Sequence, residues 1–245
     1  MPCFYVPDLN KTAENIWITG EEFHHIVHVR RKKVGDHIDL TNGNGLLADT
    51  IITEIGKKKL TVEIRDTKEI EASQPKIAVA FSLLKSKHDN LVIEKLAELG
   101  VKEFFPLITE RSVRKISPNT TEKFRKAAIA AIKQCDNAFL PEINLPLEIN
   151  DALEQITNSG FSIIVALETG ERNSLNDALA KVADENICIL IGPEGGFSSQ
   201  EIELFDQRKI IPVTLGNHIL RAETASIVAV SQILYYLLER DPTYY

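Results

Sequence analysis

Three charged residues, Glu194, Arg221 and Glu223, have positions that favour catalysis. Glu194 lies within the stretch GPEGG at residues 192–196, and the other two lie shortly after Gly216. Glycine lets the backbone approach a flat ligand ring closely. A carboxylate beside such a ring can accept a proton, and a guanidinium can stabilise negative charge that develops on it. The alternative is a pair of tight turns that carry surface charges.

Two short apolar runs, 187–191 and 213–215, come before these glycine loops and suit strands buried on both faces of a sheet. In open α/β sheets, ligands bind beyond the carboxyl ends of strands, so we expect both loops at one site. The chain lacks the glycine patterns of dinucleotide sites and P-loops, which argues against a phosphate cradle. Ser198 and Glu201 have capping-box spacing, which predicts a helix directly after the first loop.

Strands and helices alternate from residue 76 onward, a pattern that predicts a mostly parallel sheet with helices on both faces. The further strands expected are 77–83, 104–108 and 161–167. The expected helices begin at Asp89, Asn119, Ser174 and after Arg221.

Residues 2–69 indicate a small β-rich unit, either a barrel or a sandwich. Its expected strands are 37–41, 46–55 and 60–64, with a strong turn signal, NGNG, at 42–45. Thr19 and Glu22 have capping-box spacing, which predicts a helix over about 20–30. A polar stretch ends in Pro75 and reads as a linker. The expected division is therefore 1–70, a linker at 71–75, and an α/β domain at 76–245.

The composition is that of a soluble globular protein: 245 residues, 44% hydrophobic and 26% charged, with a net charge of −7. It excludes a uniformly basic nucleic-acid binder but not a local basic face. Cys3, Cys135 and Cys188 form no C-x-x-C pair, so no zinc site or disulfide framework is expected, and isolated cysteines fit the cytoplasm. We expect no membrane partner, because the sequence shows no signal-peptide pattern and no apolar run of membrane length.

Two segments carry local positive charge. Residues 76–126 hold 11 Lys and Arg against 6 Asp and Glu, a net charge of +5 (11 − 6), and residues 24–33 combine three histidines with four cations. Such runs are usually solvated surface, but Arg and Lys can bind RNA phosphates and His can stack on bases. No carboxylate or cysteine completes a convincing metal site with these histidines, and no metal is expected. The candidates for RNA contact are His25, Arg30, Arg31, Lys32, Lys85, Lys87, Arg111 and Arg114.

Several strings carry a family resemblance. GPEGGFSSQEIE (192–203) and LGNHILRAETA (215–225) together resemble the C-terminal signature of the SPOUT methyltransferases, and more closely that of the bacterial 16S rRNA (uracil-N3) methyltransferase family. EEFHHIVHVRRKKVGDHIDL (21–40) is similar to the N-terminal part of the same family. The middle part is matched by Lys95, Glu98, Leu99, Gly100, Arg111 and Ser112. The chain departs from the family at Asn137, which stands where the family has an arginine.

The resemblance implies a trefoil-knotted α/β domain that binds S-adenosylmethionine (SAM), a PUA-like RNA-binding barrel before it, and a homodimer. The helix at 225–238 supports the homodimer, because it is apolar on nearly every face. The residues implied to hold SAM are Leu167, Glu168, Ile191, Gly192, Glu194, Gly195, Leu215, Gly216, Asn217, Ile219, Leu220, Ala222 and Thr224.

The implied reaction is methylation of N3 of one uridine in 16S rRNA, within the assembled small ribosomal subunit. Uracil N3 carries a proton, so the reaction needs a base or a cation that stabilises the uracil anion. Glu223 and Glu194 are the candidate bases and Arg221 is the candidate cation; alternatively, Arg221 forms a structural ion pair with one of these acids. Two other functions stay open, namely 2′-O-ribose methylation and RNA binding without catalysis.

Overall fold

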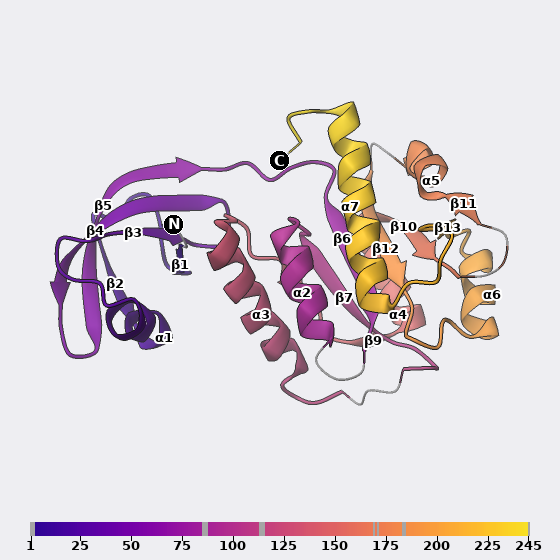
Figure 1. Ribbon diagram of the computed structural model, residues 1–245, viewed down its shortest axis with the longest axis horizontal. Helices are drawn as coiled ribbons and strands as arrows, with labels where there is room; N and C mark the ends of the chain where they lie inside the picture. The colour runs from indigo at the N-terminus through magenta and orange to yellow at the C-terminus, as the bar shows by residue number, and fades with distance from the viewer. Residues whose placement is uncertain are drawn as a thin grey trace. The chain divides into compact units, whose positions relative to one another are not determined.

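The computed structural model describes residues 3–84, 88–112, 116–168, 170, 172–182 and 185–244. The chain forms two compact units, which are shown in Figure 1. The first unit comprises Met1–Ala72 together with Ile129–Leu140, and the second comprises Ser73–Ala128 together with Pro141–Tyr245. The sequence placed residues 129–140 in the C-terminal domain, whereas in the structure they pack with the N-terminal unit.

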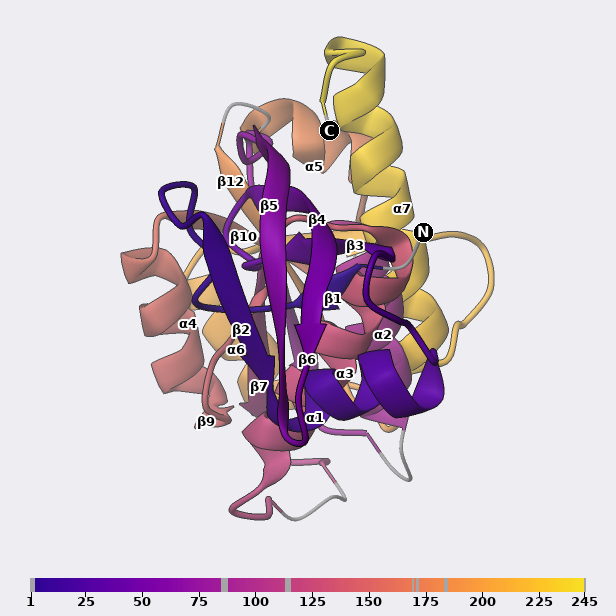
Figure 2. The same ribbon diagram turned by 90° about the vertical axis from the view of Figure 1, so that its left-hand side faces the viewer.

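The first unit is built on a sheet of five strands, counted among its described residues, in the order β1-β3-β4-β5-β2. Antiparallel pairing joins β3 to β4, β4 to β5 and β5 to β2, and β1 runs parallel to β3 (Figure 2). The bounds are Phe4–Tyr5 for β1, Asn15–Thr19 for β2, His37–Thr41 for β3, Leu46–Ile55 for β4 and Lys59–Glu69 for β5. The small β-rich unit predicted from the sequence is confirmed.

Alternation of buried and exposed residues gives this sheet one core face. In β2, Ile16 and Ile18 are buried while Trp17 between them is exposed, as the two-residue period of a strand requires. Register shifts at Asp49/Thr50 and at Ile52/Glu54 interrupt the pairing of β4 with β5, as β-bulges do.

The helical segment that follows β2 confirms the predicted helix but not its predicted cap. The α-helix α1 (Gly20–His24) continues into a π-helical turn, His25–Val29, and Arg30 N–H bonds to His25 O at 2.8 Å. Thr19 makes no side-chain cap bond, so the predicted capping box is wrong. Glu22 instead accepts a bond from Lys133 Nζ at 2.5 Å, and that tertiary ion pair replaces the local cap.

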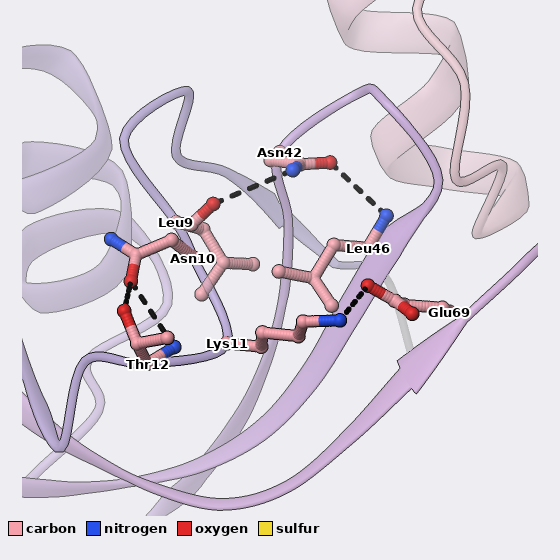
Figure 3. A network of polar contacts seen from close by, with 7 residues as sticks. All are labelled: Leu9, Asn10, Lys11, Thr12, Asn42, Leu46 and Glu69. Carbon is pink, nitrogen blue, oxygen red and sulfur yellow. Dashed lines mark hydrogen bonds and ion pairs between the residues drawn. The ribbon is translucent and has the colours of Figure 1, made fainter.

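The predicted NGNG turn is a packing site as well as a turn. The backbone of residues 138–140 bonds to it, with Leu140 N–H on Gly43 O at 2.8 Å. A Cβ on Gly43 would lie 2.9 Å from Leu140 Cβ, so only glycine permits this approach. Figure 3 shows how Asn42 ties the turn together, with its amide nitrogen 3.4 Å from Leu9 O and its amide oxygen 3.1 Å from Leu46 N.

The second unit is an α/β domain, as predicted. Its described residues form an eight-stranded sheet in the order β11-β13-β10-β12-β6-β7-β8, with β9 also paired to β7, and all pairs are parallel. The strands are β6 (Ile77–Ser82), β7 (Glu103–Ile108), β8 (Glu142–Ile143), β9 (Leu147–Glu148), β10 (Phe161–Ala166), β11 (Asn173–Ser174), β12 (Asn186–Ile191) and β13 (Ile211–Thr214).

Helices cover both faces of this sheet. Figure 2 shows α4 and α7 on opposite sides of the strands, and α2 packs beside α7. Cys188 and Leu190 of β12 face a cluster that contains Leu153 of α4 and Phe205 of α6. The helices are α2 (His88–Glu98), α3 (Thr120–Cys135), α4 (Ile149–Asn158), α5 (Leu175–Val182), α6 (Ser199–Gln207) and α7 (Ala222–Arg240). None of the helices in the described ranges is both long and apolar enough to cross a membrane.

Of two helix starts predicted from local sequence, one is observed and the other is not. The capping box of Ser198 and Glu201 is present in full at the start of α6, as predicted. Asp89, in contrast, does not start its helix: α2 begins at His88, and Asp89 Oδ1 accepts from Leu84 N–H at 2.7 Å. The trefoil knot implied by the resemblance stays a prediction.

Candidate active site

A pocket of about 740 Å³ lies at the carboxyl ends of β10, β12 and β13. These strands are adjacent in the sheet, in the order β13-β10-β12, so the loops that follow them converge on one space. The loops comprise residues 167–168, 192–197 and 215–221. The expectation that both glycine loops meet at one place therefore matches the arrangement of the sheet.

The glycine loop after β12 brings bare backbone to the pocket. A Cβ on Gly192 would meet the ring of Phe197 at 3.0 Å, and Gly196 has a φ of +67°, which favours glycine. Gly195 is different, because a Cβ there would lie 3.6 Å from Arg111, an ordinary contact. At Gly195 the fold tolerates a side chain, so a side chain there would take up pocket space without straining the backbone.

Arg111 and Glu201 hold this glycine loop to the loop that follows β7. Arg111 Nη1 donates to Gly195 O at 2.9 Å and to Phe197 O at 3.2 Å. Glu201, buried at the start of α6, accepts from Ser198 N–H at 2.7 Å with one oxygen and from Glu110 N–H at 2.9 Å with the other. The two side chains fix both loops in one geometry. The RNA-contact role expected of Arg111 stays a prediction, and its observed partners are loop carbonyls.

The three candidate catalytic residues do not all lie in the pocket. Glu194 and Arg221 line it, and Arg221 also stands at the N-cap of α7. Glu223 lies in the first turn of the same helix but is not among the lining residues. Its carboxylate faces His88, with Oε1 3.5 Å from His88 Nδ1. Of the two candidate bases, Glu194 is therefore the one whose side chain borders the pocket.

The residues that the resemblance implied for SAM lie together, with one exception. Thr224 is exposed on the first turn of α7 and does not line the pocket. The members that do line it are Leu167, Glu168, Ile191, Gly192, Glu194, Gly195, Leu215, Gly216, Asn217, Ile219, Leu220 and Ala222.

Other lining residues were missed by the sequence analysis. Arg172 donates to Glu168 O at 2.5 Å and to Leu167 O at 3.4 Å, so it shapes the loop after β10. Thr214 Oγ1 donates to Gly216 O at 2.9 Å and shapes the loop after β13. Neither residue belongs to a recognisable motif, although Thr214 lies within the strand predicted over residues 213–215. The missed residues also include Ala166, Pro193, Gly196, Phe197, Ile202, His218 and Ala225.

The N-terminal candidates for RNA contact differ in their exposure and in their hydrogen bonds. Arg30 and Arg31 are exposed after the π-helical turn, whereas Lys32 Nζ bonds back to His37 O at 3.0 Å. The pKa of His25 is lowered by burial and by the nearby charge of Lys133. This environment disfavours a positive charge on His25, which suits the ring to stacking more than to charge pairing. Lys85, Lys87 and Arg114 lie outside the described residues.

In the described ranges, no group of three or more His, Cys, Asp and Glu side chains is placed to hold a metal ion. The pocket is lined instead by backbone, by apolar side chains and by a few charged side chains. Such a site suits an organic ligand that carries a flat ring.

Comparisons with known proteins agree with this geometry. The RNA methyltransferase domain family matches residues 71–234, and the RNA methyltransferase PUA domain family matches residues 18–65. The ribosomal RNA small subunit methyltransferase E of Rickettsia conorii is 31% identical over 232 residues, which cover 91% of this chain and 92% of that protein.

Solved structures show the same fold. A Legionella pneumophila protein, solved in complex with bound SAM, is 29% identical and superposes with a TM-score of 0.84 over 96% of this chain and 97% of that one. The Neisseria gonorrhoeae ribosomal RNA small subunit methyltransferase E, 23% identical, shares the fold with a TM-score of 0.87 over 96% and 97% of the two chains. The chain therefore belongs to the ribosomal RNA small subunit methyltransferase E family of RNA methyltransferases.

Proposed function

We propose that the chain transfers the methyl group of SAM to N3 of one uridine in 16S rRNA, within the assembled small ribosomal subunit in the cytoplasm. The observation that carries the proposal is the pocket in which bare glycine backbone, Glu194 and Arg221 border one space. Family membership supports the reaction class. The name of the Rickettsia conorii relative supports the substrate, and the SAM complex of the Legionella pneumophila protein supports the cofactor.

The lining residues fit SAM. Gly195 leaves room that a larger side chain would fill, and at Gly192 the ring of Phe197 packs against the bare backbone. Leu167, Ile191 and Leu215 give apolar surface for a flat ring, and the carboxylates at the rim suit a ligand that carries positive charge. SAM supplies a methyl group on a positively charged sulfur that is already a good leaving group.

The work of the protein is to orient the uracil and to handle its proton. Positioning the nucleophile in line with the methyl group accounts for much of the acceleration in such a transfer. As N3 forms its bond to carbon and the carbon–sulfur bond breaks, the N3 proton must leave. In this proposal Glu194 accepts the proton and Arg221 stabilises the negative charge on the uracil oxygens, and the lining of the pocket by both residues supports these roles. No step requires a metal.

In this proposal the two parts of the chain have different roles. Residues 1–70 bind RNA as a PUA-like barrel, residues 71–75 are the linker, and residues 76–245 bind SAM and catalyse. The exposed cations Arg30 and Arg31 support the first role, because phosphate contacts supply much of the affinity for nucleic acid.

A homodimer completes the proposal. A second, mostly apolar groove of about 650 Å³ lies between α5 and α7, and it shares Thr214, Leu215 and Gly216 with the cofactor pocket. Tyr235 on this groove is 65% exposed and adds an aromatic side chain to the apolar surface. A second copy would cover this surface. Light scattering is expected to report a dimer for the native chain and a shift toward monomer for Tyr235→Glu; a native monomer would contradict this part.

The test of the enzymatic proposal is transfer of labelled methyl from SAM to three substrates: intact small subunits, free 16S rRNA and large subunits. Label is expected in the small subunits alone or in large excess over the others, with little transfer by Arg221→Ala. Absence of label from both small subunits and free 16S rRNA would overturn the proposal and would favour RNA binding without catalysis.

A further inference from the structure

Trp17 is a large aromatic side chain left in solvent on the edge strand of the first unit. Its neighbours Ile16 and Ile18 are buried, whereas Trp17 is 69% exposed. It lies opposite Thr61 in the pairing of β2 with β5, on the face of the sheet that points away from the core. Tryptophan carries a large apolar surface and is enriched at binding interfaces.

Positive charge gathers at the same place. Lys59 Nζ lies over the indole ring of Trp17, 4.9 Å from its centre. Lys57 and Lys58 occupy the turn just before and are also exposed. Two acids lie nearby: Glu63 is paired with Arg65 at 3.1 Å, which reduces its effect on the lysines, and Glu54 is exposed opposite Thr61 on β4. One ammonium group therefore lies over the exposed indole and two more follow one another in the adjoining turn, on a chain whose net charge is −7.

An indole with adjacent cations is the combination that recognises unpaired nucleotides. The flat ring stacks on a base, and the ammonium groups neutralise the phosphate on either side. A base inside a duplex has no free face, so this chemistry selects single-stranded RNA. An acidic peptide would use the lysines but would have no need of the ring.

We propose that Trp17 and Lys57, Lys58 and Lys59, together the Trp17 platform, bind an unpaired nucleotide of the RNA substrate. The inference rests on the proposed function, because it takes RNA as the ligand. The Trp17 platform is separate in sequence from the basic segment at residues 24–33. It gives the N-terminal unit a second RNA contact, one that distinguishes single-stranded from double-stranded RNA rather than responding to charge alone.

The chain offers a direct probe, because Trp17 is its only tryptophan. Titration of the full-length protein with a short oligouridylate is expected to quench tryptophan fluorescence in a saturable way. An RNA duplex with the same number of phosphates is expected to bind, if at all, without comparable quenching. Oligouridylate binding measured by anisotropy with no change in fluorescence would overturn the proposal, as would equal quenching by the duplex.

Variants separate stacking from charge. Trp17→Ala is expected to weaken oligouridylate binding roughly tenfold, while Trp17→Phe, which keeps a stacking ring, stays close to the native protein. Replacing Lys57, Lys58 and Lys59 by Gln is expected to weaken binding and to flatten its salt dependence. Lys68→Gln, at the other end of β5, is the matched control and is expected to change little. Unaltered affinity in a folded Trp17→Ala protein would overturn the proposal.

Failure of this inference is distinguishable from failure of the proposed function. Methyl transfer to small subunits by the native protein is measured in parallel. A native protein that methylates the subunit but shows no quenching refutes the Trp17 platform alone. Quenching without any methyl transfer supports the platform and refutes the enzymatic proposal.

Discussion

Arg111 donates from Nη1 to the carbonyl oxygen of Gly195, 2.9 Å away, and so joins the loop after β7 to the glycine loop after β12. The glycine loop has few side chains of its own to define its shape. Its geometry therefore depends on a residue 84 positions earlier in the chain. This dependence means that cofactor affinity can be altered from outside the glycine motif.

Arg111→Gln is expected to weaken SAM binding roughly tenfold, because the loss of two charge-assisted hydrogen bonds loosens the glycine loop. Calorimetry measures the change. Lys181→Ala, an exposed cation at the end of α5, is the control and should bind SAM like the native protein. Native affinity in Arg111→Gln would show that the loop holds its shape without the guanidinium.

Substitutions at Gly195 test the pocket itself. The backbone there accepts a side chain, so Gly195→Val should stay folded and lose SAM binding by at least roughly tenfold, with Gly195→Ala intermediate. Gly216→Val is a weaker test, because the φ of +153° at Gly216 strains any other residue. Unchanged affinity in both folded Gly195 variants would remove the pocket from the account.

Arg221→Ala is expected to lower kcat by roughly two orders of magnitude while SAM affinity changes only a few-fold, because the guanidinium acts on charge that develops in the transition state. Single-turnover kinetics with saturating SAM measures the effect. A large loss of SAM affinity with unaltered kcat would make Arg221 a binding residue instead.

Glu194→Gln and Glu223→Gln separate the two candidate bases. Glu194 borders the pocket and Glu223 faces His88, so the first variant should lose more activity than the second. If the lost group is the base, the defect should lessen as pH rises, because the uracil then ionises unaided. The reverse order of defects would assign the proton transfer to Glu223.

The stability of the N-terminal unit should depend on pH through His25. The pKa of His25 is lowered from 6.5 by burial and by Lys133, so the unfolded chain binds this proton more readily than the folded chain. The resulting stability is present above pH 6.5 and is lost as the pH falls below it. Thermal melting above and below pH 6.5 should show a smaller loss of stability at the lower pH in His25→Gln than in the native protein. His24→Gln, at the exposed neighbour, should retain the native loss; a native-sized loss in His25→Gln would contradict the prediction.

The sequence predicted those features whose causes are local. Residues 187–191 are apolar without interruption, and all five are buried in β12. Ser198 and Glu201 form their capping box because both partners sit within one helical turn. The meeting of the two glycine loops also followed from sequence, since parallel strands end at one edge of a sheet.

Features that depend on distant partners were not predictable. Glu22 has the spacing of a cap, but Lys133, 111 residues away, binds its carboxylate instead. Residues 129–140 belong to the first unit because their backbone bonds to the NGNG turn, which no periodicity records. Arg172 reaches the pocket through the loop that follows β10, and its position in the sequence gives no sign of this.

The measurement that tests the central claim most directly is mass spectrometry of nucleosides from 16S rRNA after small subunits have been incubated with SAM and the native protein. The account predicts 3-methyluridine, formed in proportion to added enzyme and nearly absent with Arg221→Ala. A 2′-O-methylated nucleoside in place of 3-methyluridine would contradict the assignment of the uracil N3 as the nucleophile.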